Sequence, residues 1–259
     1  MYFRKNRHVQ TLTLVVIFLL LAVAPITSAH GQVKNVIMMI GDGMGLSHIT
    51  AARITKGSPD EVLNMDTMPI TGFARNNSLS SLVTDSAAAG TALATGVRTE
   101  NGRIATTPDN QELKSLMLLA RDRGMGTGVA VTSKLIDATP AAYLVQAYSR
   151  SSEREIAEKV IDSNVNVLLG GGLEAFGANP FTRQPRKNSY IQKAIDKGYT
   201  FISEKEDLLA LEPAEGQNIL GLFSLGDMSY DIEKFSNEPS LAEMTTKAIE
   251  LLDTYEEGF

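Results

Sequence analysis

Short apolar runs that alternate with helical segments constrain the fold of this 259-residue chain more than any other feature. The run Asn-Val-Ile-Met-Met-Ile at residues 35–40 is typical of a strand that is buried on both faces of a parallel sheet. We predict further strands at 70–75, 127–132, 165–169 and 219–223. We predict helices at 47–54, 86–95, 112–123, 152–161, 187–197, 204–211 and 240–255. This alternation predicts a three-layer α/β/α sandwich with a mostly parallel central sheet.

The first 29 residues have the three parts of a secretory signal peptide. Three basic side chains lie within the first seven residues, an apolar run covers 12–24, and small residues follow at 27–29. An uncleaved membrane anchor is the alternative, but a spanning helix needs roughly 20 apolar residues and this run is shorter. We therefore expect cleavage near Ala29, with residues 30–259 forming the exported domain in the periplasm or outside the cell.

Charge and cysteine content exclude several classes of protein. The chain has a formal net charge of −6, and removal of the basic leader would make it more acidic. An acidic surface argues against general nucleic-acid binding, although it leaves room for one phosphate pocket with positive local potential. The sequence contains no cysteine, so disulfides and thiol chemistry are excluded.

Ser86 follows the apolar pair Leu82-Val83 and precedes an alanine-rich segment that ends at Gly96. This pattern places its hydroxyl at a strand-to-helix junction. The first N–H groups of a helix lack intrahelical partners, and the helix dipole adds partial positive charge there. An anion or an attached phosphoryl group would be held at such an end. The alternative is that Thr84-Asp85-Ser86 is an ordinary helix N-cap.

Asp42 lies between two glycines directly after the first predicted strand. Gly41 and Gly43 allow a sharp turn and leave the carboxylate free of neighbouring side chains, which suits a ligand for a hard metal ion. A plain turn is the alternative. Dinucleotide binding is a third reading, but Leu46 occupies the position of the last glycine in the G-x-G-x-x-G pattern.

Two further candidates follow the strand predicted at 127–132. Asp137 and Thr139 offer a carboxylate and a hydroxyl two residues apart, with Pro140 suited to the first turn of the next helix. Arg150 could clamp two phosphate oxygens with its planar guanidinium. Asp and Thr are also common helix caps, and a lone arginine is usually a surface residue. Because ligands gather beyond the carboxyl ends of parallel strands, we expect these segments to meet Asp42 and Ser86 at one sheet edge.

In combination and in this order, four motifs closely resemble bacterial alkaline phosphatases. The motifs are Val-Ile-Met-Met-Ile-Gly-Asp-Gly-Met-Gly at 36–45, Val-Thr-Asp-Ser-Ala-Ala at 83–88, Thr-Gly-Val-Arg-Thr at 95–99 and Asp-Ala-Thr-Pro-Ala-Ala at 137–142. Leu-Gly-Gly-Gly at 169–172 is a further marker, and the resemblance is weaker beyond it. It implies the fold of that family and hydrolysis of small phosphate monoesters.

The resemblance implies two zinc ions and one magnesium ion as cofactors. By it, Asp42 would be shared between a zinc and the magnesium site, and Ser86 would be a zinc-activated hydroxyl. Thr139 would be a magnesium ligand, and Asp137 would bind the same ion directly or through water. Paired metal ions can bind the attacking and leaving oxygens of an in-line displacement.

The resemblance also assigns the catalytic residues. Ser86 would be the nucleophile that becomes phosphoserine, Arg150 would bind the substrate phosphate, and Asp85 would orient that arginine or shape the pocket. Arginine and backbone N–H groups would neutralise the equatorial phosphoryl oxygens. A homodimer is implied by the resemblance alone.

The chain departs from the family pattern in its histidines. Zinc favours imidazole and carboxylate ligands, yet His48 is the only histidine well inside the mature chain. We therefore expect a truncated sequence, the N-terminal part of an alkaline phosphatase domain, with little activity alone. Three alternatives stay open: a non-catalytic phosphate-binding module, another metal-dependent phosphoryl or sulfuryl hydrolase of the superfamily, and a nicotinamide-binding domain.

Overall fold

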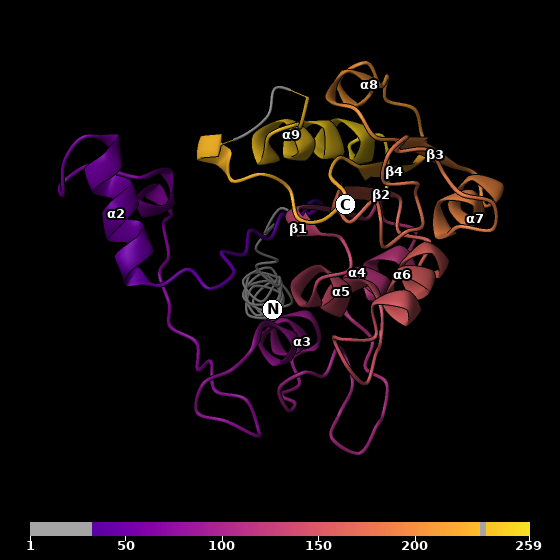
Figure 1. Ribbon diagram of the computed structural model, residues 1–259. Helices are drawn as coiled ribbons and strands as arrows, with labels where there is room; N and C mark the ends of the chain where they lie inside the picture. The colour runs from indigo at the N-terminus through magenta and orange to yellow at the C-terminus, as the bar shows by residue number, and fades with distance from the viewer. Residues whose placement is uncertain (1–32, 234–236) are drawn as a thin grey trace, which may run out of the picture. The chain divides into compact units, whose positions relative to one another are not determined.

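The computed structural model describes residues 33–233 and 237–259, and its chain is divided into a first unit, residues 1–34, and a second unit, residues 35–259. The predicted signal peptide lies outside the described residues. The second unit contains every helix and strand that follows (Figure 1). No helix within the described residues combines the length and the hydropathy that crossing a membrane requires.

The second unit alternates helices and strands along its length. Its helices are α2 (Leu46–Lys56), α3 (Ser86–Thr95), α4 (Leu116–Arg121), α5 (Ala138–Leu144), α6 (Glu153–Asp162), α7 (Tyr190–Asp196), α8 (Lys205–Leu209) and α9 (Leu241–Leu252). Its strands are β1 (Gly128–Lys134), β2 (Val167–Gly171), β3 (Tyr199–Ile202) and β4 (Asn218–Leu222). Two short 3₁₀ helices, η1 and η2, cover Asn64–Thr67 and Asp231–Glu233.

The four strands form one parallel sheet in the order β1-β2-β4-β3. In register, Leu168 of β2 pairs with Val129 of β1 and with Leu220 of β4. Each connection between parallel neighbours passes through a helix, as parallel pairing requires. The prediction of a mostly parallel α/β sheet is confirmed.

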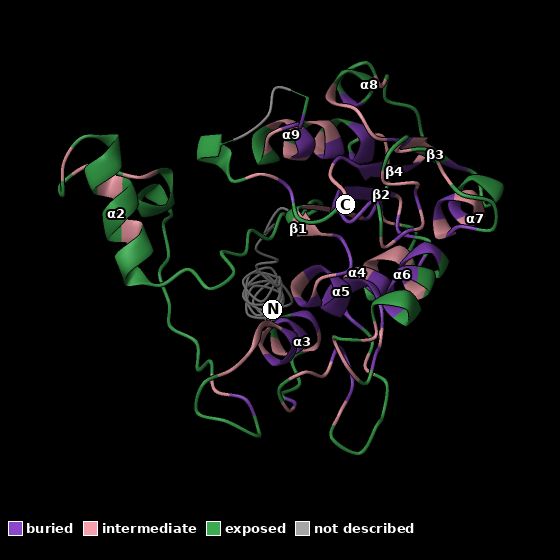
Figure 2. Cartoon of the chain, in the orientation of Figure 1, coloured by how far each residue is buried: buried purple, intermediate pink, exposed green. Residues whose placement is uncertain are grey.

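Apolar side chains on alternate positions of the strands enter two separate cores. Leu168 and Leu220 belong to a core that includes buried residues of α5, α6 and α7. Val167 and Leu169 belong to a second core with buried residues of α8 and α9. Since successive strand residues point to opposite faces, these two cores lie on the two faces of the sheet. Figure 2 shows the buried residues gathered in the strands and in the helices beside them.

Three of the predicted strands correspond to β1, β2 and β4, whereas β3 was not predicted. β3 has only four residues, follows directly after Gly198, and lies at the edge of the sheet. Its end residues, Tyr199 and Ile202, are buried while Thr200 is exposed. A run this short gives too little periodicity to be distinguished from the end of the preceding helix.

Two predicted strands, 35–40 and 70–75, are wrong: both segments lack regular structure, as does the pair Leu82-Val83. Strands need hydrogen-bonded neighbours, and the described sheet ends at β1 without pairing to residues 35–40. Within that run the Val36 N–H donates to the Phe259 carbonyl at 2.7 Å. Continuous hydrophobicity predicted burial, but most of these side chains are exposed.

The helix-start predictions divide in a similar way. Ser240 and Glu243 have the Ser-x-x-Glu spacing of a capping box and form one at the start of α9, since each side chain accepts the other residue's backbone N–H, at 3.1 and 2.7 Å. Ser152 and Glu155 have the same spacing before α6, and from it a capping box is predicted there too; this prediction is wrong, because Ser152 makes no side-chain cap hydrogen bond. The Ser152 backbone has ψ of 51°, away from the extended conformation of most N-caps.

Candidate active site

Ser86 is the first residue of α3, where the sequence predicted a helix to begin. Asp85 is the N-cap, and its Oδ1 accepts the Ala88 N–H at 3.0 Å. Gly96 ends the helix in the left-handed conformation, with φ of 74°, which favours glycine. The half-buried Ser86 hydroxyl therefore lies at the positive end of the helix dipole.

Asp42 joins Ser86 to Thr139 through hydrogen bonds that cross long stretches of sequence. The Ser86 hydroxyl donates to Asp42 Oδ1 at 3.2 Å, and the Thr139 hydroxyl donates to Asp42 Oδ2 at 2.6 Å. Asp42 lies in a tight turn in which Gly43 has φ of 65°. The expected meeting of these segments is found, although the described residues that precede Asp42 and Ser86, from residue 33 onward, form no strand.

Asp137 and Arg150 form the second half of the cluster. Asp137 is the N-cap of α5, and its Oδ1 accepts both the Ala138 N–H at 2.8 Å and Arg150 Nη2 at 3.0 Å. Arg150 Nη1 reaches Asp85 Oδ2 at 3.4 Å. The guanidinium thus bridges the caps of α3 and α5, with a third of its side chain exposed to solvent. An exposed, oriented guanidinium can receive an anion.

Lys134 and two carboxylates extend this polar region at the carboxyl end of β1. Lys134 Nζ donates to Glu153 at 2.5 Å, and the Lys134 N–H donates to Asp227 at 2.8 Å. The hydrogen bond to Glu153 raises the pKa of Lys134, with smaller contributions from the charges of Glu153, Asp227 and Asp137, while burial acts in the opposite direction. Sequence reasoning missed Lys134, although its place at a strand end was a usable signal.

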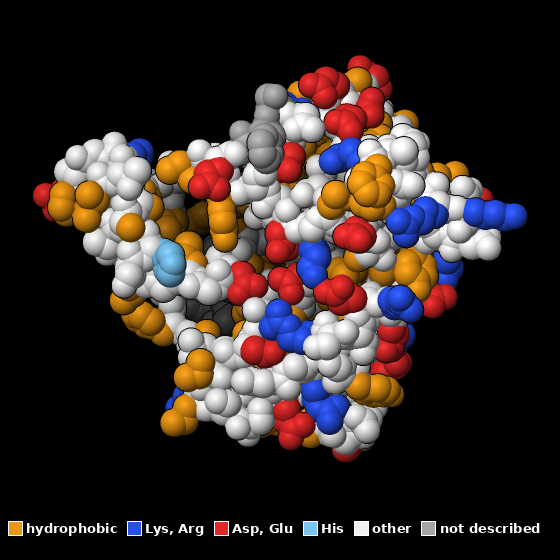
Figure 3. Space-filling view, viewed as in Figure 1, with side chains coloured by type: hydrophobic (Ala, Val, Ile, Leu, Met, Phe, Trp, Pro, Cys, Tyr) orange, Lys and Arg blue, Asp and Glu red, His pale blue; other side chains and the backbone are white. Residues whose placement is uncertain are grey.

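The surface in this part of the molecule is mixed in charge. Figure 3 shows Asp and Glu side chains interspersed with Lys and Arg over the face in view. Mixed charge differs from the clustered basic surface that nucleic-acid binding uses.

The cluster presents oxygen donors, which suit magnesium better than zinc. Asp42, Asp137, Thr139 and Ser86 contribute carboxylate and hydroxyl oxygens, the donors that hard divalent cations prefer. His48 lies on the exposed helix α2, and its Nδ1 accepts the Gly45 N–H at 3.1 Å. Across residues 33–233 and 237–259, no three His, Cys, Asp or Glu side chains are grouped as a metal site. The oxygen donors of the cluster are of the kind that magnesium prefers, whereas the described residues do not supply a zinc-ligand set.

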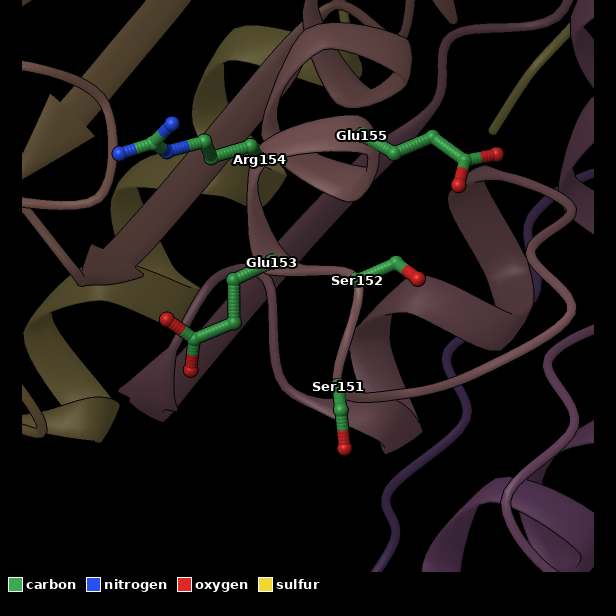
Figure 4. Close-up of a pocket in the computed structure, with 5 residues that line it drawn as sticks. All are labelled: Ser151, Ser152, Glu153, Arg154 and Glu155. Atoms are coloured by element: carbon green, nitrogen blue, oxygen red, sulfur yellow. The ribbon is translucent and has the colours of Figure 1, made fainter.

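An open depression at the start of α6 lies next in sequence to this cluster. It is lined by Ser151, Ser152, Glu153, Arg154 and Glu155 (Figure 4). Glu153 and Arg154 point to one side of the helix, whereas Ser152 and Glu155 point to the other. Because these side chains do not converge on one point, we place the candidate site at Asp42, Ser86 and Arg150 instead.

Asn101 and Gly102 both contact the cluster, although the sequence at these positions indicates no more than an Asn-Gly turn. Asn101 Oδ1 accepts the Asp85 N–H at 3.1 Å, and the Gly102 N–H donates to Asp85 Oδ2 at 2.9 Å. The Asn-Gly pair signals a turn in any sequence. The hydrogen bond between Asn101 and Asp85 joins residues sixteen positions apart, so no local sequence pattern predicts it.

Comparison with known proteins identifies the family of the chain. Residues 33–259 match the profile of the alkaline phosphatase family, and the chain belongs to that family. It is 36% identical over 244 residues to alkaline phosphatase 4 of Bacillus subtilis, covering 88% of this chain and 50% of the relative.

Solved structures give the same result. The cold-active alkaline phosphatase from the psychrophile Shewanella sp. superposes with a TM-score of 0.75 and 34% identity, over 85% of this chain and 53% of that one. A variant of the TAB5 alkaline phosphatase, solved with magnesium in its M3 site, gives 0.74 and 29%, over 87% and 62%. The chain thus spans about half the length of the Bacillus relative and the Shewanella enzyme.

Proposed function

We propose that the protein hydrolyses small phosphate monoesters, with Ser86 as the nucleophile. One observation carries the proposal: Asp42 accepts hydrogen bonds from both the Ser86 and the Thr139 hydroxyls, across 44 and 97 residues of sequence. This arrangement sets a nucleophilic hydroxyl, a carboxylate and a second hydroxyl beside the oriented guanidinium of Arg150. Membership of the alkaline phosphatase family supports the same reaction.

Asp42, Thr139 and Asp137 are the residues that we propose to hold magnesium. When bound, the ion would supply positive charge that fixes the Asp42 carboxylate and strengthens the local field at the Ser86 hydroxyl. The family resemblance also implies zinc, and Asp42 and Ser86 would face it. Since the described residues supply no zinc-ligand set, no step below depends on zinc.

Arg150 binds the phosphoryl group, and the start of α3 lies beside it. The guanidinium carries several N–H donors in one plane, which matches two oxygens of a phosphate. Asp85 and Asp137 hold that plane from two sides, at 3.4 and 3.0 Å. The helix dipole at Ser86 adds to the stabilisation of negative charge on the same group.

The reaction proceeds in two displacements. Ser86 Oγ releases its proton to solvent and attacks phosphorus, and its bond to phosphorus forms as the bond to the ester oxygen breaks. The departing alkoxide takes a proton from water and leaves as the alcohol. A water molecule then attacks the phosphoserine, which releases inorganic phosphate and restores the hydroxyl. In each step charge on the equatorial oxygens is balanced by Arg150.

We propose the following export, substrates and assembly for the protein. Residues 1–29 are a signal peptide, and residues 30–259 are the N-terminal part of an alkaline phosphatase domain that acts in the periplasm or outside the cell. Phosphate monoesters are its substrates, and a homodimer is its assembly. The acidic net charge is consistent with no role in nucleic-acid binding.

Phosphorylation of Ser86 tests the mechanism directly. The chain is incubated with a phosphate monoester, zinc and magnesium salts, quenched in acid, and examined by intact mass and peptide mass spectrometry. We expect one added phosphoryl group, located on Ser86, and its complete loss in Ser86→Ala. Ser151→Ala is the matched control, since Ser151 is an exposed serine next to Arg150.

Two outcomes would contradict the proposal. A phosphoryl group on a different serine would remove Ser86 from its role. Phosphate binding without any phosphoserine, in a chain whose fold is verified by circular dichroism, would favour the non-catalytic binding module.

A further inference from the structure

The turn at Asn101-Gly102 touches both halves of the candidate site. The Asn101 side chain contacts the segment that carries Ser86, and the Gly102 peptide contacts the residues that orient Arg150. The Ser86 hydroxyl is hydrogen-bonded to Asp42, and the guanidinium of Arg150 to Asp85 and Asp137, so the turn acts on both groups through other residues. Resting on the proposed function, we infer that this turn is a positioning element that sets the nucleophile and the phosphate-binding arginine in register.

The Asn101 amide spans the backbone just before Ser86. Its Oδ1 accepts the Asp85 N–H at 3.1 Å, while its Nδ2 donates to the Val83 carbonyl at 3.1 Å. One side chain thus holds both peptides that flank Thr84. The Asn101 N–H in turn donates to Ser80 Oγ at 3.0 Å, so the amide is itself anchored. The backbone before α3 that leads to Ser86 lacks regular structure. The Asn101 side chain therefore supplies hydrogen bonds that a neighbouring strand would otherwise provide.

The Gly102 peptide connects the α3 cap to Arg150. Its N–H donates to Asp85 Oδ2 at 2.9 Å, the same oxygen that faces Arg150 Nη1 at 3.4 Å. Its carbonyl accepts the Arg150 N–H at 2.8 Å. The single residue Gly102 therefore contacts the backbone of Arg150 and the carboxylate that orients its guanidinium. A shift of this turn would move both partners of the phosphate site together.

Glycine is required at 102 by conformation and not by space. Gly102 has φ of +85°, and a Cβ built there would meet no atom within 4 Å. An alanine would adopt this conformation only with strain, which the turn would relieve by moving. Gly216 is a matched control, because it has φ of +74°, an equally open surrounding, and a place in the loop between α8 and β4.

Asn101 is exposed, so its truncation removes two hydrogen bonds and no core packing. Asn166 offers the matched control for an amide clamp: its Oδ1 accepts the Thr127 N–H at 3.1 Å, and its Nδ2 donates to Asn218 at 3.0 Å. Asn166→Ala should lower stability at least as much as Asn101→Ala, since it is less exposed. A loss of phosphate affinity that occurs in Asn101→Ala and not in Asn166→Ala is therefore not caused by lowered stability.

The experiment uses the full 259-residue chain and inorganic phosphate as the probe, with zinc and magnesium salts present. Binding is followed by isothermal titration, and backbone order by hydrogen exchange of the peptides that contain Asp85 and Gly102. We expect Asn101→Ala and Gly102→Ala to speed exchange at Asp85 and to weaken phosphate binding about five-fold, as loss of about 1 kcal/mol predicts. Asn166→Ala and Gly216→Ala should leave both quantities unchanged.

Three results would overturn the inference, and each can be distinguished from the others. Unchanged exchange and unchanged phosphate affinity in Asn101→Ala would reject the positioning role while the proposed function stands. Phosphate binding that Arg150→Ala does not weaken would reject the proposed function itself, and the positioning role with it. Equal losses in Asn101→Ala and Asn166→Ala would reduce Asn101 to a stability contact.

Discussion

Residues 33–83 and residues 86–259 carry apolar side chains in similar patterns but bury them to very different extents. In the first segment Ile70 and Phe73 are almost fully exposed, at 87% and 104%. In the second, Leu168 and its core neighbours are fully buried. The regular structure of the first segment rests on local hydrogen bonds, whereas that of the second depends on packing between residues far apart in the sequence.

Helices α2 and α9 show the same contrast at nearly equal length. α2 has 11 residues, none of them buried, while α9 has 12 residues and buries four against the sheet. A helix satisfies its own backbone hydrogen bonds, so it can persist in an exposed segment. A strand cannot, and residues 35–40 therefore remain irregular in spite of their composition.

The largest expected effect is on the stability of the packed region. Leu168→Ala should lower the free energy of unfolding by about 2–5 kcal/mol, because it leaves a cavity between the sheet and its helices. Ile70→Ala removes a side chain of equal size from the exposed segment and should change stability by less than about 0.5 kcal/mol. Urea unfolding followed by circular dichroism measures both. Similar losses in the two variants would show that Ile70 is buried in solution.

The sequence predicted most of the packed region and few contacts of the exposed one. Three of four strands were predicted because each contains a short apolar run flanked by helical segments; β2 and β4 are almost wholly buried, while β1 is only partly buried. β3 and the irregular segment at 35–40 were not, since edge position and absent neighbours are not encoded in a local pattern. The site residues Asp42, Ser86, Asp137, Thr139 and Arg150 were singled out from spacing and family resemblance. The contacts of Asn101 were missed because they join positions with no periodic relation.

Asp42 is one of the points at which the exposed segment joins the packed region, beside contacts such as that of Val36 with Phe259, and its replacement tests its share of that link. Asp42→Asn keeps the shape but removes the charge that strengthens the bonds from Ser86 and Thr139. We expect trypsin to cleave residues 46–75 a few fold faster, while the urea midpoint of the packed region stays nearly constant. Asp60→Asn makes the same change of charge in the exposed segment and should leave cleavage unchanged. Equal cleavage of Asp42→Asn and the unmodified chain would mean that other contacts hold the segment.

The smallest expected effect concerns Glu243, which caps the packed helix α9. Hydrogen bonds from Lys205, then from the backbone and side chain of Ser240, lower the pKa of Glu243 from 4.5 to about 2 against the opposing effect of burial. A lowered carboxyl pKa stabilises the folded state above pH 4.5, and this stabilisation is lost as the pH falls through 2.

Glu243→Gln removes the charge but keeps an acceptor for the Ser240 N–H. The loss near neutral pH should be below about 1 kcal/mol because the ion pair with Lys205 is partly exposed. Urea unfolding at a series of pH values should show this difference shrinking between pH 4.5 and 2. Glu250→Gln, on the same helix, controls for net charge. If the difference in unfolding free energy stays constant with pH, the loss comes from the helix cap and not from the ion pair with Lys205. In that case α9 would differ from α2 in its packing and its cap, and not in its ion pair.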